Sequence, residues 1–163
     1  MPILTVMVGV PGAGKSTYRK KHFEGAFVAS TDDYIEAKAV EYGTTYNQCF
    51  KEQYGNALEA LKKGLKLAIE QRRDVVYDQT NLTAKKRKAI LSQFPSHYEK
   101  HCVVAATEDI VTDVRNASRP EGRKIPREII DTMRQSYQVP QLNEGFDKIT
   151  FVDGFGNEVV MRG

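Results

Sequence analysis

The pattern G-x-x-x-x-G-K-S near the N-terminus constrains the fold more than any other feature. It spans Gly9–Ser16. An apolar run, Ile3–Val8, precedes it and is typical of a buried strand, and a polar segment, Lys15–His22, follows it and is typical of a helix. A strand, a glycine-rich loop and a helix in this order indicate a phosphate-binding P-loop. The glycines let several N–H groups point at one anion, and the helix N-terminus adds a partial positive charge.

The residues of a nucleotide site follow from this motif. We expect the loop to hold the phosphates of ATP or another nucleoside triphosphate. Lys15 should reach the β- and γ-phosphates, and Ser16 should bind Mg²⁺. The predicted nucleotide-binding residues of the motif are Gly9, Gly12, Ala13, Gly14, Lys15, Ser16 and Thr17.

Strand and helix patterns alternate along the rest of the chain. Further strands are expected at 26–29, 74–78, 100–106 and 149–152, with a short final strand at 158–161. Further helices are expected from 31 to a break at 42–45, and at 47–72, 84–93, 108–119 and 126–138. This alternation predicts an α/β fold of the P-loop NTPase type, with a mainly parallel sheet of about five strands and helices on both faces. The 163 residues fit a single domain, 1–163.

Two local features of the helices can be predicted. Thr31 is a plausible N-cap for the helix that opens with two aspartates. In the helix 47–72, Phe50, Tyr54, Leu61 and Leu65 fall close to one face, as in an amphipathic helix.

Carboxylates follow two of the expected strands, at the edge of a parallel sheet where ligands bind. Asp32 and Asp33 point about a hundred degrees apart on a helix, so only one of them can face the phosphates. We predict that Asp32, nearer the strand end, is the general base for a hydroxyl acceptor and that Asp33 caps or supports the helix. Asp78 closes the strand 74–78 and is the predicted second Mg²⁺ ligand. The alternatives are that Asp32 and Asp33 only stabilise the N-terminus of the helix, and that Asp78 only starts a turn.

A group of arginines suggests a lid. Arg115 and Arg119 are four residues apart, hence on one helix face, and Arg123 follows in a segment punctuated by proline and glycine. We predict a mobile lid over about 115–127 that brings all three arginines to the nucleotide, with Arg119 stabilising the transferred phosphoryl group. The alternative is a solvated basic face.

Two basic runs remain. Lys85–Lys88, together with Arg19–Lys21, could form a surface that tracks the phosphates of a polynucleotide. A solvent-exposed helix face is the ordinary alternative.

Taken together, these motifs resemble the kinase domain of phage-type polynucleotide 5′-kinases and, more widely, the P-loop kinases that phosphorylate hydroxyls. The matching segments are 9–17, 31–34, 78–82, 115–119 and 125–126. The resemblance implies that Lys15 and Ser16 hold the donor phosphates and Mg²⁺, that Asp32 is the base, and that Arg119 contacts the donor phosphates. It places the acceptor near Asp32, Thr80 and Ile125.

The sequence departs from the family at one position. An arginine that grips the acceptor's phosphate is expected three residues after the base, where this chain has Ile35. Lys38 lies one turn further on, but lysine cannot make a bidentate phosphate contact. The residues predicted to bind the acceptor are Asp33, Ile35, Lys38, Thr80, Asn81 and Ile125.

The sequence therefore predicts an ATP- and Mg²⁺-dependent kinase that transfers the γ-phosphate to a nucleic acid hydroxyl, foremost the 5′-hydroxyl of DNA or RNA. A hydroxymethyl group on a modified pyrimidine of phage DNA, and a small nucleoside or metabolite, are alternative acceptors. An NTP-binding switch without transfer is the alternative from another class. Because no membrane span or signal peptide is visible, we expect a cytoplasmic protein, in the host cytoplasm if phage-encoded. The oligomeric state stays open.

Overall fold

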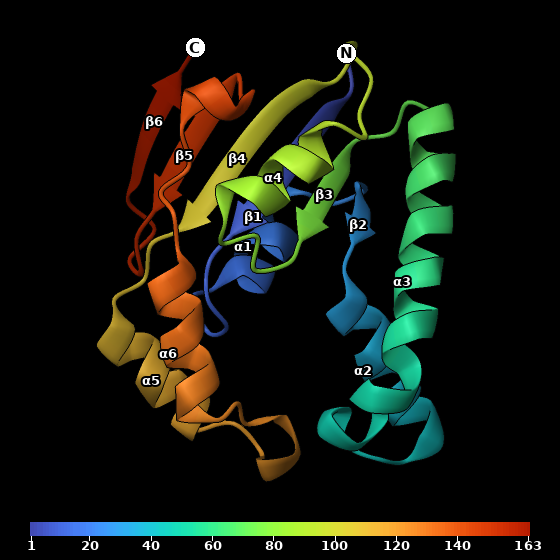
Figure 1. Ribbon diagram of the computed structural model, residues 1–163, viewed down its shortest axis with the longest axis vertical. Coiled ribbons are helices and arrows are strands. Elements are labelled where there is room, and N and C mark those ends of the chain that lie inside the picture. The colour runs from blue at the N-terminus through green and yellow to red at the C-terminus, as the bar shows by residue number, and fades with distance from the viewer.

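The computed structural model describes residues 1–163 and is built around a six-stranded sheet (Figure 1). Its strand order is β2-β3-β1-β4-β5-β6. The strands are β1 Ile3–Val8, β2 Phe27–Ala29, β3 Val75–Asp78, β4 Glu99–Ala105, β5 Lys148–Val152 and β6 Glu158–Arg162. The pairings among β1 to β5 are parallel, and β6 runs antiparallel to β5. The predicted parallel sheet is confirmed, and the final strand adds an antiparallel edge.

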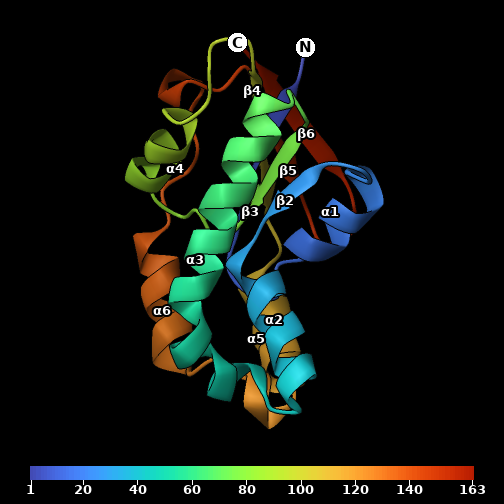
Figure 2. The same cartoon turned by 90° about the vertical axis from the view of Figure 1, so that its right-hand side faces the viewer.

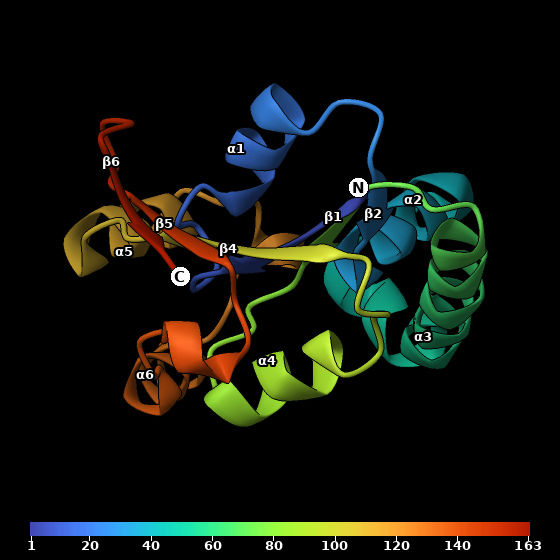
Figure 3. The same ribbon diagram turned by 90° about the horizontal axis from the view of Figure 1, so that it is seen from above.

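Helices cover both faces of this sheet. They are α1 Lys15–His22, α2 Thr31–Tyr42, α3 Tyr46–Glu70, α4 Ala84–Leu91, α5 Asp109–Ala117 and α6 Arg127–Ser136, with 3-10 turns η1 Glu121–Arg123 and η2 Leu142–Glu144. Seen from above, α1 lies on one side of the sheet and α4 on the other (Figure 3). In Figure 1, α2, α5 and α6 lie beyond the carboxyl ends of the parallel strands. None of the helices has the combination of length and apolar character that a bilayer span requires.

The alternation of side chains along β1 divides the core into two layers. Leu4 and Val6 are fully buried in the larger cluster, which α3 and α4 complete. Met7 points to the opposite face, where it packs with Val103 and with Tyr18 of α1. The P-loop is therefore joined to a strand that is anchored on both faces.

The cap of α2 differs from the prediction. Ser30, not Thr31, is the N-cap, and its hydroxyl accepts a hydrogen bond from the backbone N–H of Asp33. Thr31 is the first helical residue, and its buried side chain bonds to Gln79. The prediction was off by one residue: serine and threonine are both favoured N-cap residues, and serine, the more favoured of the two, takes the position here.

The apolar face of α3 is buried in its C-terminal half but not at its N-terminal end. Leu61 and Leu65 are buried, but Phe50 and Tyr54 are each 41% exposed. A helix of 25 residues is roughly 37 Å long at 1.5 Å per residue, whereas β2 has only 3 residues. The first half of α3 therefore extends past the sheet beside α2 (Figures 1 and 2).

The predicted phosphate-tracking surface is wrong for two of its arginines. Arg87 has no exposed surface, and its guanidinium bonds to the Glu144 carboxylate and to the backbone carbonyls of Asn81 and Leu82. Arg19 is also buried. Arg87 holds the loop after β3 in place, Arg19 pairs with Asp33 and Asp78, and only the lysines of these runs are exposed on the helix surfaces.

Candidate active site

The P-loop places the start of α1 beneath an open cavity. Gly14 is the N-cap of α1 with φ of 97°, a left-handed conformation that favours glycine. Lys15 follows directly, and its Nζ donates to the carbonyl oxygens of Gly9 at 2.7 Å and Val10 at 3.1 Å. The pKa of Lys15 is lowered to about 8, chiefly by desolvation and in small part by Arg119, while Asp78 and Asp32 oppose the shift. An anionic ligand would relieve this cost.

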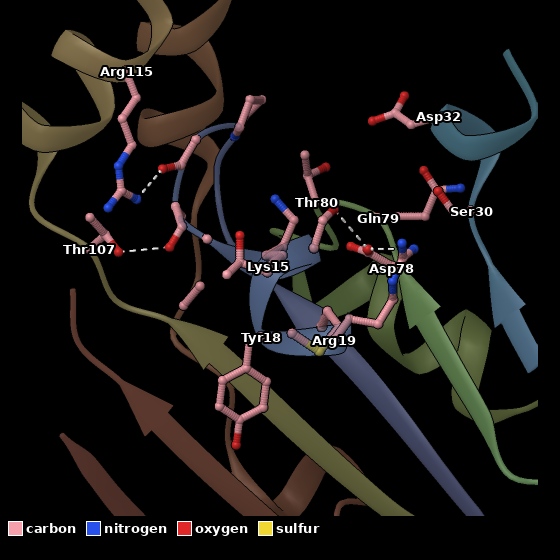
Figure 4. A pocket seen from close by; sticks show the side chains of 18 of the residues that line it. Lys15, Tyr18, Arg19, Ser30, Asp32, Asp78, Gln79, Thr80, Thr107 and Arg115 are labelled. Carbon is pink, nitrogen blue, oxygen red and sulfur yellow. Dashed lines mark hydrogen bonds and ion pairs between the residues drawn. The ribbon is translucent and has the colours of Figure 1, made fainter. Parts of the chain in front are cut away.

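Side chains from distant segments brace the loop. Arg115 of α5 donates to the carbonyl of Gly12 at 2.8 Å, and Thr107 donates to that of Ala13 at 2.7 Å (Figure 4). The backbone N–H of Gly9 donates to the carbonyl of Thr80. These contacts link the P-loop to the segments that follow β3 and β4.

A cavity of about 1150 Å³ gathers most of the predicted site residues. Its lining includes every residue from Gly12 to Thr17, as well as Asp32, Asp33, Asp78, Thr80, Arg115, Arg119, Arg123 and Ile125. Gly9, Ile35, Lys38 and Asn81 are not part of the lining. The topology thus brings together the P-loop, the start of α2, the end of β3 and the arginine-rich segment.

Ser16 and Asp78 meet at one end of this cavity. The Ser16 hydroxyl donates to Oδ2 of Asp78 at 3.2 Å. Asp78 is buried, and this burial raises its pKa above the usual range, although Arg19 and Lys15 act in the opposite direction. A hydroxyl and a carboxylate beside the P-loop fit Mg²⁺, which prefers oxygen ligands and takes its others from nucleotide phosphates and water. No three acidic, histidine or cysteine side chains are arranged so that they could hold a metal ion, so Ser16 and Asp78 would hold it only together with a nucleotide.

Arg19 was not predicted as a site residue, yet it organises the two neighbouring carboxylates. Its Nη1 lies 3.0 Å from Oδ2 of Asp78 and 2.9 Å from Oδ2 of Asp33. Asp33 is therefore engaged by a buried cation, in keeping with the supporting role expected for it. Arg19 belongs to a run of three basic residues, so nothing in the sequence distinguishes it from Lys20 and Lys21.

Asp32 points into the cavity from the start of α2 (Figure 4). Its side chain is 57% exposed. Oδ1 accepts a hydrogen bond of 2.5 Å from the phenol of Tyr46, and Oδ2 lies 3.9 Å from Nη2 of Arg123. Burial and this carboxylate raise the pKa of Tyr46, which keeps its phenol a donor. Asp32 and Asp33 thus contact different partners, as expected for adjacent helical residues whose side chains point about a hundred degrees apart.

The arginines of segment 115–127 occupy two different environments. Arg119 is half-buried in the cavity lining and makes no ion pair or side-chain hydrogen bond. Burial and the charge of Arg123 lower its pKa. Arg123 instead pairs with Glu36 at 2.8 Å and stacks over the ring of Tyr46, with its guanidinium carbon 3.8 Å from the ring centroid. Arg119 is therefore the free cation, and nucleotide binding by Arg123 stays a prediction.

The tip of this segment touches the start of α3. Gly122 lies against Thr45 so closely that a Cβ on residue 122 would overlap the threonine side chain. The Asn47 amide also donates to the carbonyl of Lys124 at 3.3 Å. The arginine-rich segment and α3 therefore meet across the cavity.

Three predicted acceptor contacts are placed elsewhere by the structure. Ile35 is fully buried in a cluster with Ala39, Cys49 and Ala57, so it belongs to the α2–α3 interface. Lys38 pairs with Glu41 at 2.9 Å and lies outside the cavity lining. The predictions for these two residues transferred a family position onto side chains that do not line the cavity.

Asn81 is the third misplaced contact. It is buried with φ of 47°, and its amide donates to the carbonyl of Met7 at 2.8 Å. It therefore fixes the turn after β3, as turn asparagines do. Thr80 and Ile125 do line the cavity, but their contact with an acceptor stays a prediction.

The family follows from comparison with known proteins. The family model described as "AAA domain" matches residues 4–140. The chain belongs to this AAA-domain family. It is also 27% identical over 160 residues to the Arabidopsis thaliana protein named transcription factor bHLH140, a match that covers 91% of this chain and 16% of that protein. The chain thus spans only about a sixth of this curated relative.

Solved structures share the fold. One is a kinase-like protein from Chloroflexus aurantiacus, with a TM-score of 0.65, 16% identity, and coverage of 93% of this chain and 88% of that one. A second comes from the PezAT chromosomal toxin-antitoxin system of Streptococcus pneumoniae, with a TM-score of 0.62, 20% identity, and coverage of 98% and 71%. A third is a sugar kinase from Janibacter, with a TM-score of 0.62, 16% identity, and coverage of 94% and 86%. The chain is a P-loop protein of kinase-like fold.

Proposed function

We propose that this protein transfers the γ-phosphate of ATP to a hydroxyl group, with Asp32 as the base that takes the hydroxyl proton. The observation that carries the proposal is the position of Asp32. Its carboxylate lines the same cavity as Lys15 and the unpaired Arg119, but it comes from α2 and not from the P-loop. A carboxylate there is placed for an acceptor rather than for the nucleotide.

The reaction assigns a task to each of these residues. The P-loop N–H groups and Lys15 bind the donor phosphates, and Arg119 neutralises charge that develops on the transferred group. Asp32 accepts the proton as the acceptor oxygen bonds to the γ-phosphorus and the bond from that phosphorus to the β–γ bridging oxygen breaks. ADP leaves with the electron pair of the broken bond. Ser16 and Asp78 would hold Mg²⁺, which supplies charge neutralisation when bound.

The charges around Asp32 favour a small acceptor over a polynucleotide. The position of the family's phosphate-gripping arginine is the buried Ile35, Arg123 is neutralised by Glu36, and Arg87 is inside the fold. Exposed lysines of α4 and the motif resemblance support the second candidate acceptor, a 5′-hydroxyl end of DNA or RNA. A polynucleotide acceptor would use its phosphates for affinity, which requires cations that are free to bind them.

Transfer of labelled γ-phosphate from ATP–Mg²⁺ tests the proposal. The acceptor panel holds nucleosides, simple sugars, 5′-hydroxyl DNA, 5′-hydroxyl RNA, and duplex DNA with hydroxymethyl pyrimidines and blocked ends. We expect label on a small hydroxyl compound, and none with Lys15→Ala. Label only on oligonucleotide ends would establish a 5′-hydroxyl of DNA or RNA as the acceptor. Label only on the modified bases would establish the hydroxymethyl group of a pyrimidine as the acceptor. Tight ATP binding without label on any acceptor would contradict kinase activity and favour a switch.

A further inference from the structure

We propose that the acceptor carries a flat aromatic or heteroaromatic ring, in a molecule of about nucleoside size, and that this ring stacks on Phe50 and Tyr54 of α3. This inference rests on the proposed kinase function, because it concerns the acceptor side of the same cavity. It concerns residues that neither the motif nor the predicted reaction uses.

Aromatic rings form a continuous row along α3. Tyr46, Phe50 and Tyr54 are spaced four residues apart, so they project from one helix face. The centroids of Tyr46 and Phe50 are 5.9 Å apart, and those of Phe50 and Tyr54 are 5.1 Å apart with planes inclined by 29°. Arg123 covers the ring of Tyr46. The end of the row nearest the base is therefore capped, and the other two rings are not.

The two uncapped rings remain open to the cavity. Phe50 and Tyr54 both line it, and each is 41% exposed. These two adjacent rings form an apolar patch in contact with water, and contiguous patches of this kind can mark ligand-binding grooves. A stacked ligand ring would cover this surface and gain the offset-stacked contact that aromatic groups favour.

A second apolar wall completes the site. Ile129 and Met133 of α6 line the same cavity, together with Ile125 and Pro126. In Figure 1, α6 and α3 stand on opposite sides of the lower part of the molecule. A flat ring on the α3 row would therefore face aliphatic side chains on the other side of the cavity, an environment that suits a planar group with two apolar faces.

Tyr46 connects the part of the site that would bind the acceptor hydroxyl with the part that would bind its ring. Its phenol bonds to Asp32, and its ring is the neighbour of Phe50 in the row. A hydroxyl beside Asp32 and a ring on Phe50 therefore belong to one small molecule. Because Asp32 is a carboxylate and Arg123 beside it is already paired with Glu36, the groups next to the acceptor hydroxyl favour an uncharged acceptor over a phosphorylated one.

A tryptophan reporter tests this site without requiring turnover. The chain contains no tryptophan, so Phe50→Trp introduces a single fluorophore into the row. Uridine and adenosine are titrated in the presence of ADP, with ribose as the ringless probe. Leu67→Trp is the matched control, since Leu67 is an exposed residue of the same helix outside the cavity lining. In Phe50→Trp we expect saturable quenching of the indole fluorescence by at least one nucleoside and none by ribose, and in the control no saturable change.

A kinetic arm separates this inference from the proposed function. With the labelled acceptor from the panel, Phe50→Leu and Tyr54→Leu should each raise the acceptor KM about tenfold, as the loss of one stacked ring does, while the affinity for ADP stays unchanged. Equal responses to nucleosides and ribose, or an unchanged acceptor KM in both leucine variants, would overturn the ring site and leave the kinase standing. Saturable quenching with no transfer to any acceptor would keep the ring site and overturn the kinase.

Discussion

The phenol of Tyr46 donates a 2.5 Å hydrogen bond to Oδ1 of Asp32, from the first turn of α3 to the first turn of α2. A charge-assisted bond of this kind fixes a carboxylate that is otherwise 57% exposed. Asp32 is therefore held toward the cavity by a neighbouring helix rather than left to rotate in solvent. The same tyrosine lies under Arg123, so the arginine-rich segment and Asp32 share one contact point.

Loss of this bond should slow transfer without weakening nucleotide binding. In Tyr46→Phe the ring and its stacking remain, but Asp32 loses its donor. We expect kcat to fall about tenfold, in line with a hydrogen bond to a charged group. The affinity for ADP should stay unchanged, as measured by calorimetry. An unchanged kcat would mean that Tyr46 does not position Asp32.

The lowered pKa of Lys15 predicts pH-dependent nucleotide binding. In the free protein the pKa of Lys15 is about 8, and donor phosphates favour the charged form. Binding of ADP should therefore take up a proton above this pH, and affinity should fall as the pH rises from about 8 toward about 10, the ordinary lysine range. Calorimetry in buffers of different ionisation enthalpy measures this uptake. In Lys15→Arg the group stays charged, so the same pH dependence in the variant would contradict the assignment.

Arg119 should contribute to the rate because it is the unpaired guanidinium of the cavity lining. We expect Arg119→Ala to lower the transfer rate roughly a hundredfold or more, the size of loss typical of a group that stabilises transition-state charge. Arg127→Ala is the matched control, since Arg127 pairs with Asp113 and Asp131 on the surface. A loss of transfer rate below about threefold for Arg119→Ala would mean that Arg119 is only a surface residue.

Arg87 should matter for stability rather than for nucleic acid binding. Its side chain is 0% exposed and its partner Glu144 is 3% exposed, so Arg87→Met leaves a buried carboxylate without a cation. The free energy of unfolding should fall by about 3 kcal/mol or more, as measured by denaturant titration. Lys86→Met, one residue away on the exposed face, should change it by less than about 0.5 kcal/mol. Similar decreases in the free energy of unfolding for Arg87→Met and Lys86→Met would contradict this account of Arg87.

The fold could be predicted from the sequence because its signals are local. The P-loop pattern, the apolar strands and the helix periodicities each depend on neighbouring residues, and the order of elements limits the topology. The rule that ligands bind at the carboxyl edge of a parallel sheet also predicts that Asp32 and Asp78 lie near the P-loop, and both line its cavity.

The acceptor side could not be predicted because its residues depend on distances between elements. The burial of Ile35 arises from the packing of α2 on α3, which the spacing in either helix does not encode. Arg19 and Arg87 resemble their exposed lysine neighbours in sequence, and only their partners Asp78 and Glu144 distinguish them. Phe50 has the periodicity of a core residue, but α3 extends beyond the sheet at that point.

The measurement that tests the central claim most directly is phosphoryl transfer by Asp32→Asn and Asp33→Asn, with the best acceptor of the panel and with ADP affinity measured in parallel. The two residues are adjacent and both line the cavity, but Asp33 pairs with the buried Arg19 at 2.9 Å, whereas Asp32 lies 3.9 Å from Arg123. We predict that Asp32→Asn abolishes transfer and binds ADP normally, while Asp33→Asn retains transfer at a reduced stability. Near-normal turnover by Asp32→Asn would contradict the proposal that Asp32 is the base.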